Sequence, residues 1–266
     1  MPIPRPIADP LLSLLSAALH ASPFKTRLGG ISTVTAKVFG LHARTEVRTA
    51  RLRNGIRLPV RLSDYNGRML YLFGTPDPKV VTVCRTLLRK NDVFLDIGAN
   101  FGTVGLLSHD AVGPGGRVHF VEPQPELAGI IRDAVAKAGV PAEVHNCGIW
   151  DEDGELTLSI PDKHTGAATL AGNPGAARGI TVPVRSIASF LDDTVKDRPF
   201  GAKVDVEGAE PKILPTILAH PSLRFVLFEC NVPEVRAHAW ELIGAKRLAF
   251  FGLSKHLFSV RLRAVR

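Results

Sequence analysis

The segment DIGANFG, from Asp96 to Gly102, combines residue types that suit the binding of a charged ligand. It follows a continuous apolar run and leads into a helical pattern, which is where open α/β sheets bind ligands. Gly98 and Gly102 would let the backbone pass close to a ligand, and Asn100 tolerates turn geometry. A buried carboxylate at Asp96 is costly unless it meets a cation or several donors. The segment therefore predicts a ligand that carries a positive charge.

Two cofactors come close to these requirements. S-adenosylmethionine supplies an ammonium beside a sulfonium, whereas a nicotinamide dinucleotide needs a glycine-rich turn and an acid about 20 residues further on. Glu122 follows Gly102 at about that spacing, so the acid does not discriminate. The glycines do, because residues 98–103 read GANFGT and lack the second glycine of GxGxxG. An acidic Asp96 would also repel a pyrophosphate. We therefore expect S-adenosylmethionine.

Residues after the next two strands complete the expected cofactor site. Glu122 ends the run HFVEP and could accept hydrogen bonds from both ribose hydroxyls. Asn146, Cys147 and Gly148 are expected on the adenine side, with Asp151 just beyond. The residues predicted to hold the cofactor are Asp96, Gly98, Asn100, Gly102, Glu122 and Asp151.

A second cluster, KVDVEGAE from Lys203 to Glu210, places three carboxylates close together. Such a group can deprotonate a hydroxyl, orient it or hold a divalent cation. If the strand persists, alternation puts Lys203, Asp205 and Glu207 on one side. The alternative is that these acids stabilise a helix N-terminus, which we favour for Glu210. Asp205 and Glu207 are the predicted catalytic residues, facing the acceptor, and no metal ligand is predicted.

These segments lie at the ends of predicted strands that alternate with helices. Helical spacing covers residues 125–138 and 210–219, and strands separated by helices imply parallel pairing. Two further runs, 245–253 and 256–264, are close enough in sequence to form an antiparallel hairpin at the sheet edge. We expect an α/β fold with the seven-stranded, Rossmann-like sheet of class I methyltransferases. The five expected parallel strands are residues 93–98, 116–123, 142–149, 203–208 and 225–230.

The remaining segments are expected to surround this sheet. Residues 154–184 form a long insertion, which is typical of functional loops, and we interpret it as a lid or wall that faces the acceptor. Residues 1–75 are predicted to be an extension packed on a main domain of residues 76–266, which opens with a helix at 77–90. The expected elements of the extension are a helix at 9–20, irregular chain up to residue 42, a hairpin at 45–62 around Asn54-Gly55, and a strand at 69–74.

The composition limits the classes of binding partner that we expect. The 266 residues include 33 Lys and Arg against 25 Asp and Glu, a net charge of +8, which attracts anions. The basic residues are scattered without interleaved aromatics, so we expect a solvated basic surface and no nucleic-acid track. Three widely spaced cysteines indicate a reducing compartment. The apolar stretch 11–19 is too short to span a bilayer. We expect a cytoplasmic protein without a transmembrane segment.

Over about residues 70–255 the sequence resembles the FkbM family of methyltransferases. The resemblance rests on VFLDIGANFGTVGLL, VHFVEPQPEL, GIWDEDGELTLSI, ITVPVRSI, and especially KVDVEGAEPKIL followed by VLFECN. It implies an S-adenosylmethionine-dependent O-methyltransferase whose acceptor is a hydroxyl of a sugar, a glycolipid or a polyketide-type metabolite. The chain departs from the family where Ser186-Ile187-Ala188 stands in place of the usual acid.

Two other functions are alternatives at this point. A binding protein could keep the cofactor fold without catalysis, but the acids at the strand ends argue against a loss of activity. A nucleic-acid methyltransferase would suit the positive charge, but enzymes that methylate base amino groups place an Asn/Asp-Pro-Pro-Tyr element after the fourth strand. This chain reads Asp205-Val206-Glu207-Gly208 there. We therefore favour a small-molecule or glycan hydroxyl as acceptor, and the sequence makes no prediction of the oligomeric state.

Overall fold

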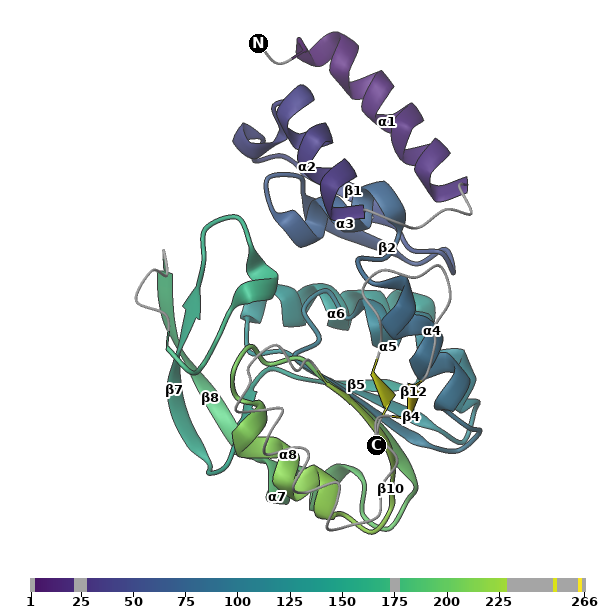
Figure 1. Ribbon diagram of the computed structural model, residues 1–266, viewed down its shortest axis with the longest axis vertical. Coiled ribbons are helices and arrows are strands. Elements are labelled where there is room, and N and C mark those ends of the chain that lie inside the picture. Colours follow the sequence, from purple (N-terminus) through teal and green to yellow (C-terminus); the bar gives the residue numbers. More distant parts are fainter. Residues whose placement is uncertain (1–2, 22–27, 173–177, 229–250, 253–262, 265–266) are drawn as a thin grey trace.

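The computed structural model describes residues 3–21, 28–172, 178–228, 251–252 and 263–264 (Figure 1). Its centre is a five-stranded parallel sheet in the order β10-β9-β3-β4-β5. The strands are β3 (Val93–Ile97), β4 (Arg117–Val121), β5 (Ala142–His145), β9 (Phe200–Val204) and β10 (Leu223–Phe228). The chain builds outward from β3 to β5 and then crosses back to β9 on the other side of β3. The order therefore reverses between β3 and β9, which is where such sheets bind ligands.

Helices cover both faces of this sheet, and the predicted helices 125–138 and 210–219 are found at those bounds. The covering helices are α4 (Pro78–Leu87), α5 (Thr103–Ser108), α6 (Pro125–Ala138), α7 (Ile187–Thr194) and α8 (Glu210–Ala219). Alternate residues of β3 point to opposite faces. Phe94 packs in one apolar cluster with residues of α4, α5 and α6, whereas Leu95 packs in a second with residues of α7 and α8. Both faces are thus buried, as the apolar strand runs predict.

The predicted strand 142–149 divides into two. β5 ends at His145, and Gly148–Trp150 forms β6, which pairs with β8 (Arg178–Ser186) in a separate sheet of order β6-β8-β7. The strand breaks after His145 because its neighbour β4 ends at Val121, the residue that pairs with His145. The Asn146 side chain donates to the carbonyls of Glu122 and Pro123 at 2.9 and 3.1 Å. The other two strands of the small sheet, β7 (Gly154–Ile160) and β8, come from the predicted insertion 154–184 and pair antiparallel.

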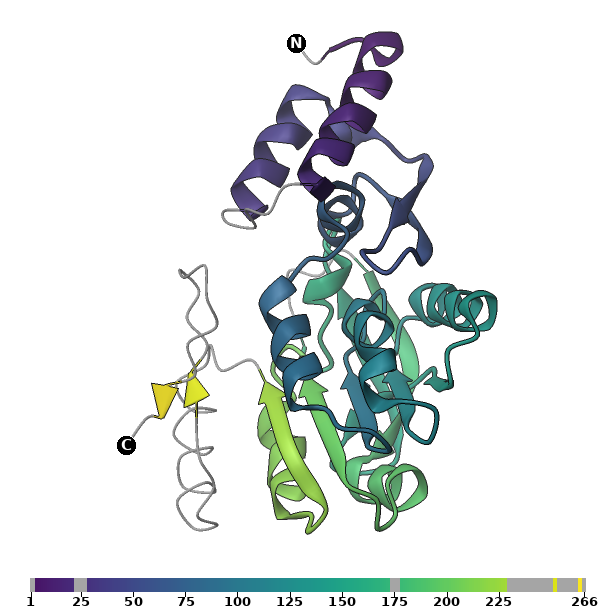
Figure 2. The same ribbon diagram turned by 90° about the vertical axis from the view of Figure 1, so that its right-hand side faces the viewer.

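The extension packs at one end of the sheet, with α1 and α2 furthest from it (Figures 1 and 2). Its elements are α1 (Arg5–Ala21), α2 (Leu28–Val38), the 3-10 turn η1 (Leu41–Ala43), β1 (Val47–Arg51), β2 (Arg57–Arg61) and α3 (Tyr65–Phe73). The predicted hairpin is confirmed, because β1 and β2 pair antiparallel. Asn54 of its turn donates to Leu106 O at 2.8 Å. Many of the buried apolar residues of the extension belong to the same apolar cluster as residues of α4, α5 and α6.

Two predictions in the extension are wrong. Helix α2 occupies part of the stretch that was expected to be irregular. The expected strand 69–74 is the end of helix α3, because Asp64 caps that helix by accepting from Gly67 N at 2.7 Å. Gly74, with a φ of 69°, ends it in a left-handed conformation. Most side chains of α3 are buried, so residues 69–74 lack the alternation of apolar and polar residues with a helical period that would have identified a helix.

The C-terminal hairpin lies mostly outside the described residues. Within them, β11 (Phe251–Gly252) pairs antiparallel with β12 (Arg263–Ala264) in a sheet of its own. Among the described residues, no helix combines the length and the hydropathy that a membrane span needs.

Candidate functional site

A buried ion pair joins the two central strands. Asp96 of β3 and Lys203 of β9 are direct neighbours in the parallel register, and their side chains are 0% and 9% exposed. Lys203 Nζ lies 3.5 Å from Asp96 Oδ1 and donates to Gly98 O at 2.6 Å. Asp96 Oδ2 accepts from Gly105 N at 2.8 Å. The cation beside Asp96 is therefore a lysine of the chain itself.

Lys203 remains charged in this setting. Burial works to lower its pKa, but the carboxylates of Asp205 and Asp96 outweigh burial, and the pKa lies above its usual value. Asp205 Oδ2 is 3.4 Å from Lys203 Nζ, so the ammonium stands between two carboxylates. One of these is sealed in the interior and the other is 43% exposed.

The turn after β3 fits only small residues in left-handed conformations. Gly98 has a φ of 71°, and a Cβ there would lie 1.8 Å from Asp205 O. Gly102 has a φ of 68° and begins α5. Asn100, with a φ of 53°, is one of the few described non-glycine residues in this region of backbone space. The turn at Gly98 therefore brings backbone against the residue that follows β9, and the close approach of this turn to a ligand stays a prediction.

Glu122, just past β4, is 3% exposed, and its carboxylate binds the same turn. Its Oε2 accepts from Asn100 N at 2.7 Å, and its Oε1 accepts from Gln124 N at 2.9 Å. Burial raises the pKa of Glu122 to about 7, although these two N–H groups oppose the rise. Because a carboxylate has about four lone-pair sites, both oxygens keep capacity for further donors.

The loop after β9 carries the two predicted catalytic residues. The strand ends at Val204, so the alternation that would have put Asp205 and Glu207 on one side does not extend to them. Glu207 is exposed and has a φ of 51°. Glu210 accepts from Val206 N at 3.2 Å and from Gly208 N at 2.8 Å, so it fixes the loop from the first turn of α8. This agrees with the structural role that we favour for Glu210.

These strand ends surround one cavity, which four predicted residues line: Gly98, Asn100, Glu122 and Asp205. Asp96 and Gly102 lie outside the lining of the cavity and support the turn after β3 from the protein interior. Asp151 also lies outside the lining, and its carboxylate pairs with Lys212 of α8 at 2.6 Å. Glu207 is likewise outside the lining. Cys147 and Gly148, which we expected on the adenine side, do line the cavity.

One wall of the cavity comes from two segments that are distant in sequence. Asp64, at the start of α3, accepts from Thr165 N of the insertion at 2.8 Å. Tyr65 stacks on His164 with ring centroids 5.0 Å apart. Asn66 donates to Asn100 Oδ1 at 3.2 Å and lines the cavity, as Thr165 does. The extension and the insertion therefore meet directly over the turn after β3.

Several polar lining residues were not predicted as site residues, among them Asn66, Thr165 and Lys203, which the sequence placed beside the acids without a role. A lysine inside an otherwise apolar strand was a signal for Lys203, since an unpaired buried cation is rare. Asn66 and Thr165 gave no such signal, because only the tertiary contact between α3 and the insertion places them here. Ser186, the first residue of the segment Ser186-Ile187-Ala188 that departs from the family, caps α7 by accepting from Ser189 N at 3.1 Å.

Comparisons with known proteins identify the family of the chain. Residues 96–242, more than half of the chain, match the family model described as the methyltransferase FkbM domain. The 31-O-demethyl-FK506 methyltransferase FkbM of Streptomyces tacrolimicus is 26% identical over an alignment of 214 residues, and the match covers 65% of this chain and 82% of that protein.

Similar solved structures are more distant. An S-adenosylmethionine-dependent O-methyltransferase of Thermotoga maritima aligns with a TM-score of 0.39 and 12% identity, over 84% of this chain and 74% of that one. The precorrin-6y C5,15-methyltransferase of Geobacter metallireducens aligns with a TM-score of 0.40 and 15% identity, over 67% of this chain and 76% of that one. These alignments are too weak to add to the match with the family model.

Proposed function

Because this chain belongs to the FkbM family of S-adenosylmethionine-dependent methyltransferases, we propose that it methylates a hydroxyl of a sugar, a glycolipid or a secondary metabolite. The observation that carries the proposal is the meeting of Gly98, Asn100, Glu122 and Asp205 around one cavity at the point where the strand order reverses. The relative named for demethyl-FK506 supports an oxygen acceptor on a secondary metabolite.

The residues around the cavity fit S-adenosylmethionine. Glu122 presents carboxylate oxygens that suit the two ribose hydroxyls, and the turn at Gly98 offers backbone at close range. Val121, Ile149 and Leu158 supply apolar lining for an adenine ring. We assign Gly98, Asn100 and Glu122 to cofactor contact.

We assign Asp96 and Gly102 to the support of the turn beneath these contacts. The structure gives Asp151 a different partner, Lys212, so the assignment of Asp151 to the cofactor stays a prediction from the sequence.

The bound cofactor supplies an activated methyl group on a sulfonium that leaves as a neutral thioether. The chain then has to align the acceptor hydroxyl and take its proton. Asp205 suits the second task, because its carboxylate is at the cavity and partly exposed while Lys203 Nζ holds it at 3.4 Å. Glu207 follows in the same loop, and Thr169 of the insertion donates to its carbonyl at 2.5 Å. We place Glu207 toward the acceptor with the insertion as the wall.

The proposal also covers the number of strands in the sheet and the domain boundary. We propose that the paired residues of β11 and β12 belong to a hairpin that brings the parallel sheet to seven strands. The domain boundary proposed from the sequence, between residues 75 and 76, falls just before α4.

The test supplies cofactor with an isotopically labelled methyl group and a panel of sugars, glycolipids and hydroxylated metabolites. Each acceptor is paired with an analogue in which the hydroxyl is already methylated. Label in a new methyl ether, formed only with the free hydroxyl, is the expected result. Label on nitrogen or carbon, or on added RNA or DNA, would contradict the proposed acceptor.

Two variants separate binding from chemistry in the same assay. Asp96→Ala removes the carboxylate beneath the turn and should abolish cofactor binding, measured by calorimetry. Glu207→Ala should bind the cofactor like the parent chain and lose turnover. Equal cofactor binding by Asp96→Ala and the parent would refute the assignment of the turn.

A further inference from the structure

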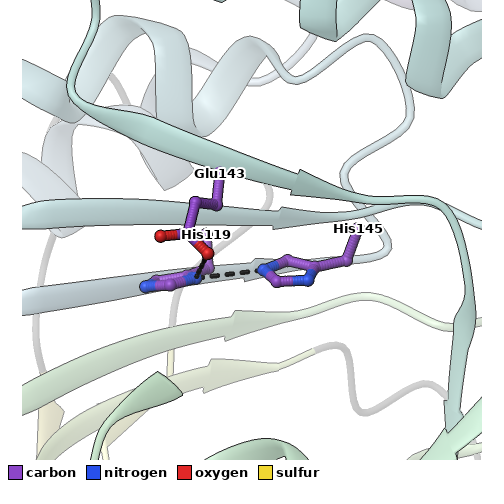
Figure 3. Close-up of side chains that lie close together, drawn as sticks. All are labelled: His119, Glu143 and His145. Carbon is purple, nitrogen blue, oxygen red and sulfur yellow. Dashed lines mark hydrogen bonds and ion pairs between the residues drawn. The ribbon is translucent and has the colours of Figure 1, made fainter. Parts of the chain in front are cut away.

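Two histidines and a glutamate meet at the edge of the five-stranded sheet, away from the cavity (Figure 3). His119 of β4 lies opposite Glu143 of β5 in the register, and His145 lies two residues further along β5, on the same face. His119 Nδ1 is 3.0 Å from His145 Nε2 and 3.9 Å from Glu143 Oε2. One ligand atom from each residue lies within 4.8 Å of the other two.

We propose that His119, Glu143 and His145 form a binding site for a divalent transition-metal ion, with zinc as the expected ion. In a tetrahedral zinc site, bonds of about 2.0–2.2 Å place neighbouring ligand atoms roughly 3.3 Å apart. The two imidazole nitrogens are already near that separation. The third ligand, Glu143, needs only a side-chain rotation, and its side chain is 49% exposed.

The surroundings favour zinc over magnesium or calcium. Arg117 donates to Glu143 Oε1 at 2.8 Å, which turns the other oxygen toward the histidines, as outer partners of metal ligands do. Arg117 and Arg185 carry positive charges close to the site, and these charges disfavour magnesium or calcium, which proteins bind mainly through negative charge. Imidazole nitrogens instead suit zinc and its neighbours among the transition metals, whereas magnesium and calcium prefer oxygen.

Burial holds the two imidazole rings in place, and the proposed site is open to solvent on the side of Glu143. The His119 side chain is 4% exposed, and Phe190 on α7 packs against His145 in a T-shaped arrangement with centroids 5.1 Å apart. Both rings are therefore fixed, and water can reach an ion from the side of Glu143 as the fourth ligand. The competing explanation is a single N–H···N bond between two neutral rings, for which 3.0 Å is equally suitable.

The site would act on the cofactor pocket only through the backbone. Glu122 N donates to His145 O at 3.1 Å, so an ion bound here would clamp the ends of β4 and β5 directly beneath the carboxylate assigned to the ribose. None of the three ligands lines the cavity. The proposed ion is structural, and it goes beyond the methyl transfer proposed above without depending on it.

The experiment uses the full chain, freed of any histidine tag and stripped of metal with a chelator. Zinc and cobalt are titrated separately, with calorimetry for zinc and visible absorption for cobalt. We expect one equivalent of each, a cobalt spectrum typical of four-coordination, and a rise in the thermal unfolding temperature with added zinc. His119→Gln with His145→Gln should abolish these responses.

Two further variants make the test specific. Glu143→Gln changes a half-exposed residue, leaves the histidine pair in place, and should weaken zinc binding about tenfold or more. His42→Gln removes an exposed histidine far from the cluster and should bind zinc like the parent. The absence of zinc binding by the parent overturns the proposal. So does equal binding by the parent and Glu143→Gln, a comparison that holds even if the double histidine variant fails to fold.

Discussion

The ends of β3 and β4 lie side by side, yet they bury their carboxylates in different ways. Asp96 is 0% exposed and Glu122 is 3% exposed. Burial raises the pKa of Asp96, and Lys203 opposes that rise at 3.5 Å. Glu122 has two backbone N–H donors and no cation within ion-pair distance among the described residues, and its pKa rises to about 7.

This difference suggests that Asp96 supports the turn after β3 and that Glu122 binds the ligand. The charge of Asp96 is balanced inside the protein, and through Lys203 it holds the carbonyl of Gly98. Glu122 lines the cavity with its charge unbalanced, so donors from a ligand would complete its environment. Two buried acids near the ends of neighbouring strands therefore have different tasks, and each can be tested through the groups that it contacts.

The largest effect is expected from Lys203→Met. It leaves Asp96 as a buried carboxylate without its cation, which costs about 3–5 kcal/mol in the free energy of unfolding. Cofactor binding should be lost as well, because Gly98 O loses its donor. Denaturant unfolding and calorimetry measure the two effects. Adding Asp96→Asn to Lys203→Met should restore part of the stability, and a double variant no more stable than the single one would contradict the pairing.

Glu122→Gln should change how stability depends on pH. The folded protein holds the Glu122 proton up to a pKa of about 7, against an ordinary value of 4.5. Between these values the folded state binds more protons than the unfolded state, so Glu122 makes stability fall as pH rises. The fall amounts to roughly 3 kcal/mol between about pH 5 and pH 8. The difference between parent and variant in urea unfolding should shift by that amount in favour of the variant, and a constant difference would refute the raised pKa.

Asp64→Ala should have a smaller effect that reaches the cofactor. It removes the cap of α3 and the acceptor of Thr165 N, at a cost of roughly 1–2 kcal/mol, and it should weaken cofactor binding severalfold because one wall loosens. Ser186→Ala is the matched control, since it also removes a helix cap but one far from the wall. Equal losses of cofactor affinity in both variants would count against the wall.

The smallest effect is expected from Asp151→Asn. The Asp151 side chain pairs with Lys212 outside the cavity, so cofactor affinity in calorimetry should stay within about twofold of the parent. A loss comparable to that of a variant at Glu122 would instead support the prediction from the sequence, which groups Asp151 with the cofactor residues.

Local signals explain which elements were predictable. Helix α6 begins with Pro125 at its first position and ends at Gly139 in a left-handed conformation, so both bounds can be read from the chain. The end of α3 could not, because its buried run has no clear period. The strand-end acids were found from their order in the chain. The pairing of Asp96 with Lys203 was not, because it depends on the register between strands that are neighbours only in the folded sheet.

The contact between Asp64 and Thr165 joins residues 101 positions apart in sequence, and it constrains how this protein can diverge. An insertion taken from a relative should require a matching change at the start of α3, because Thr165 of the insertion donates to Asp64 there. A chimaera that carries the insertion alone would leave this wall without its partner. New acceptor preferences in such chains should therefore arise by paired replacement, and the extension and the insertion should covary among relatives.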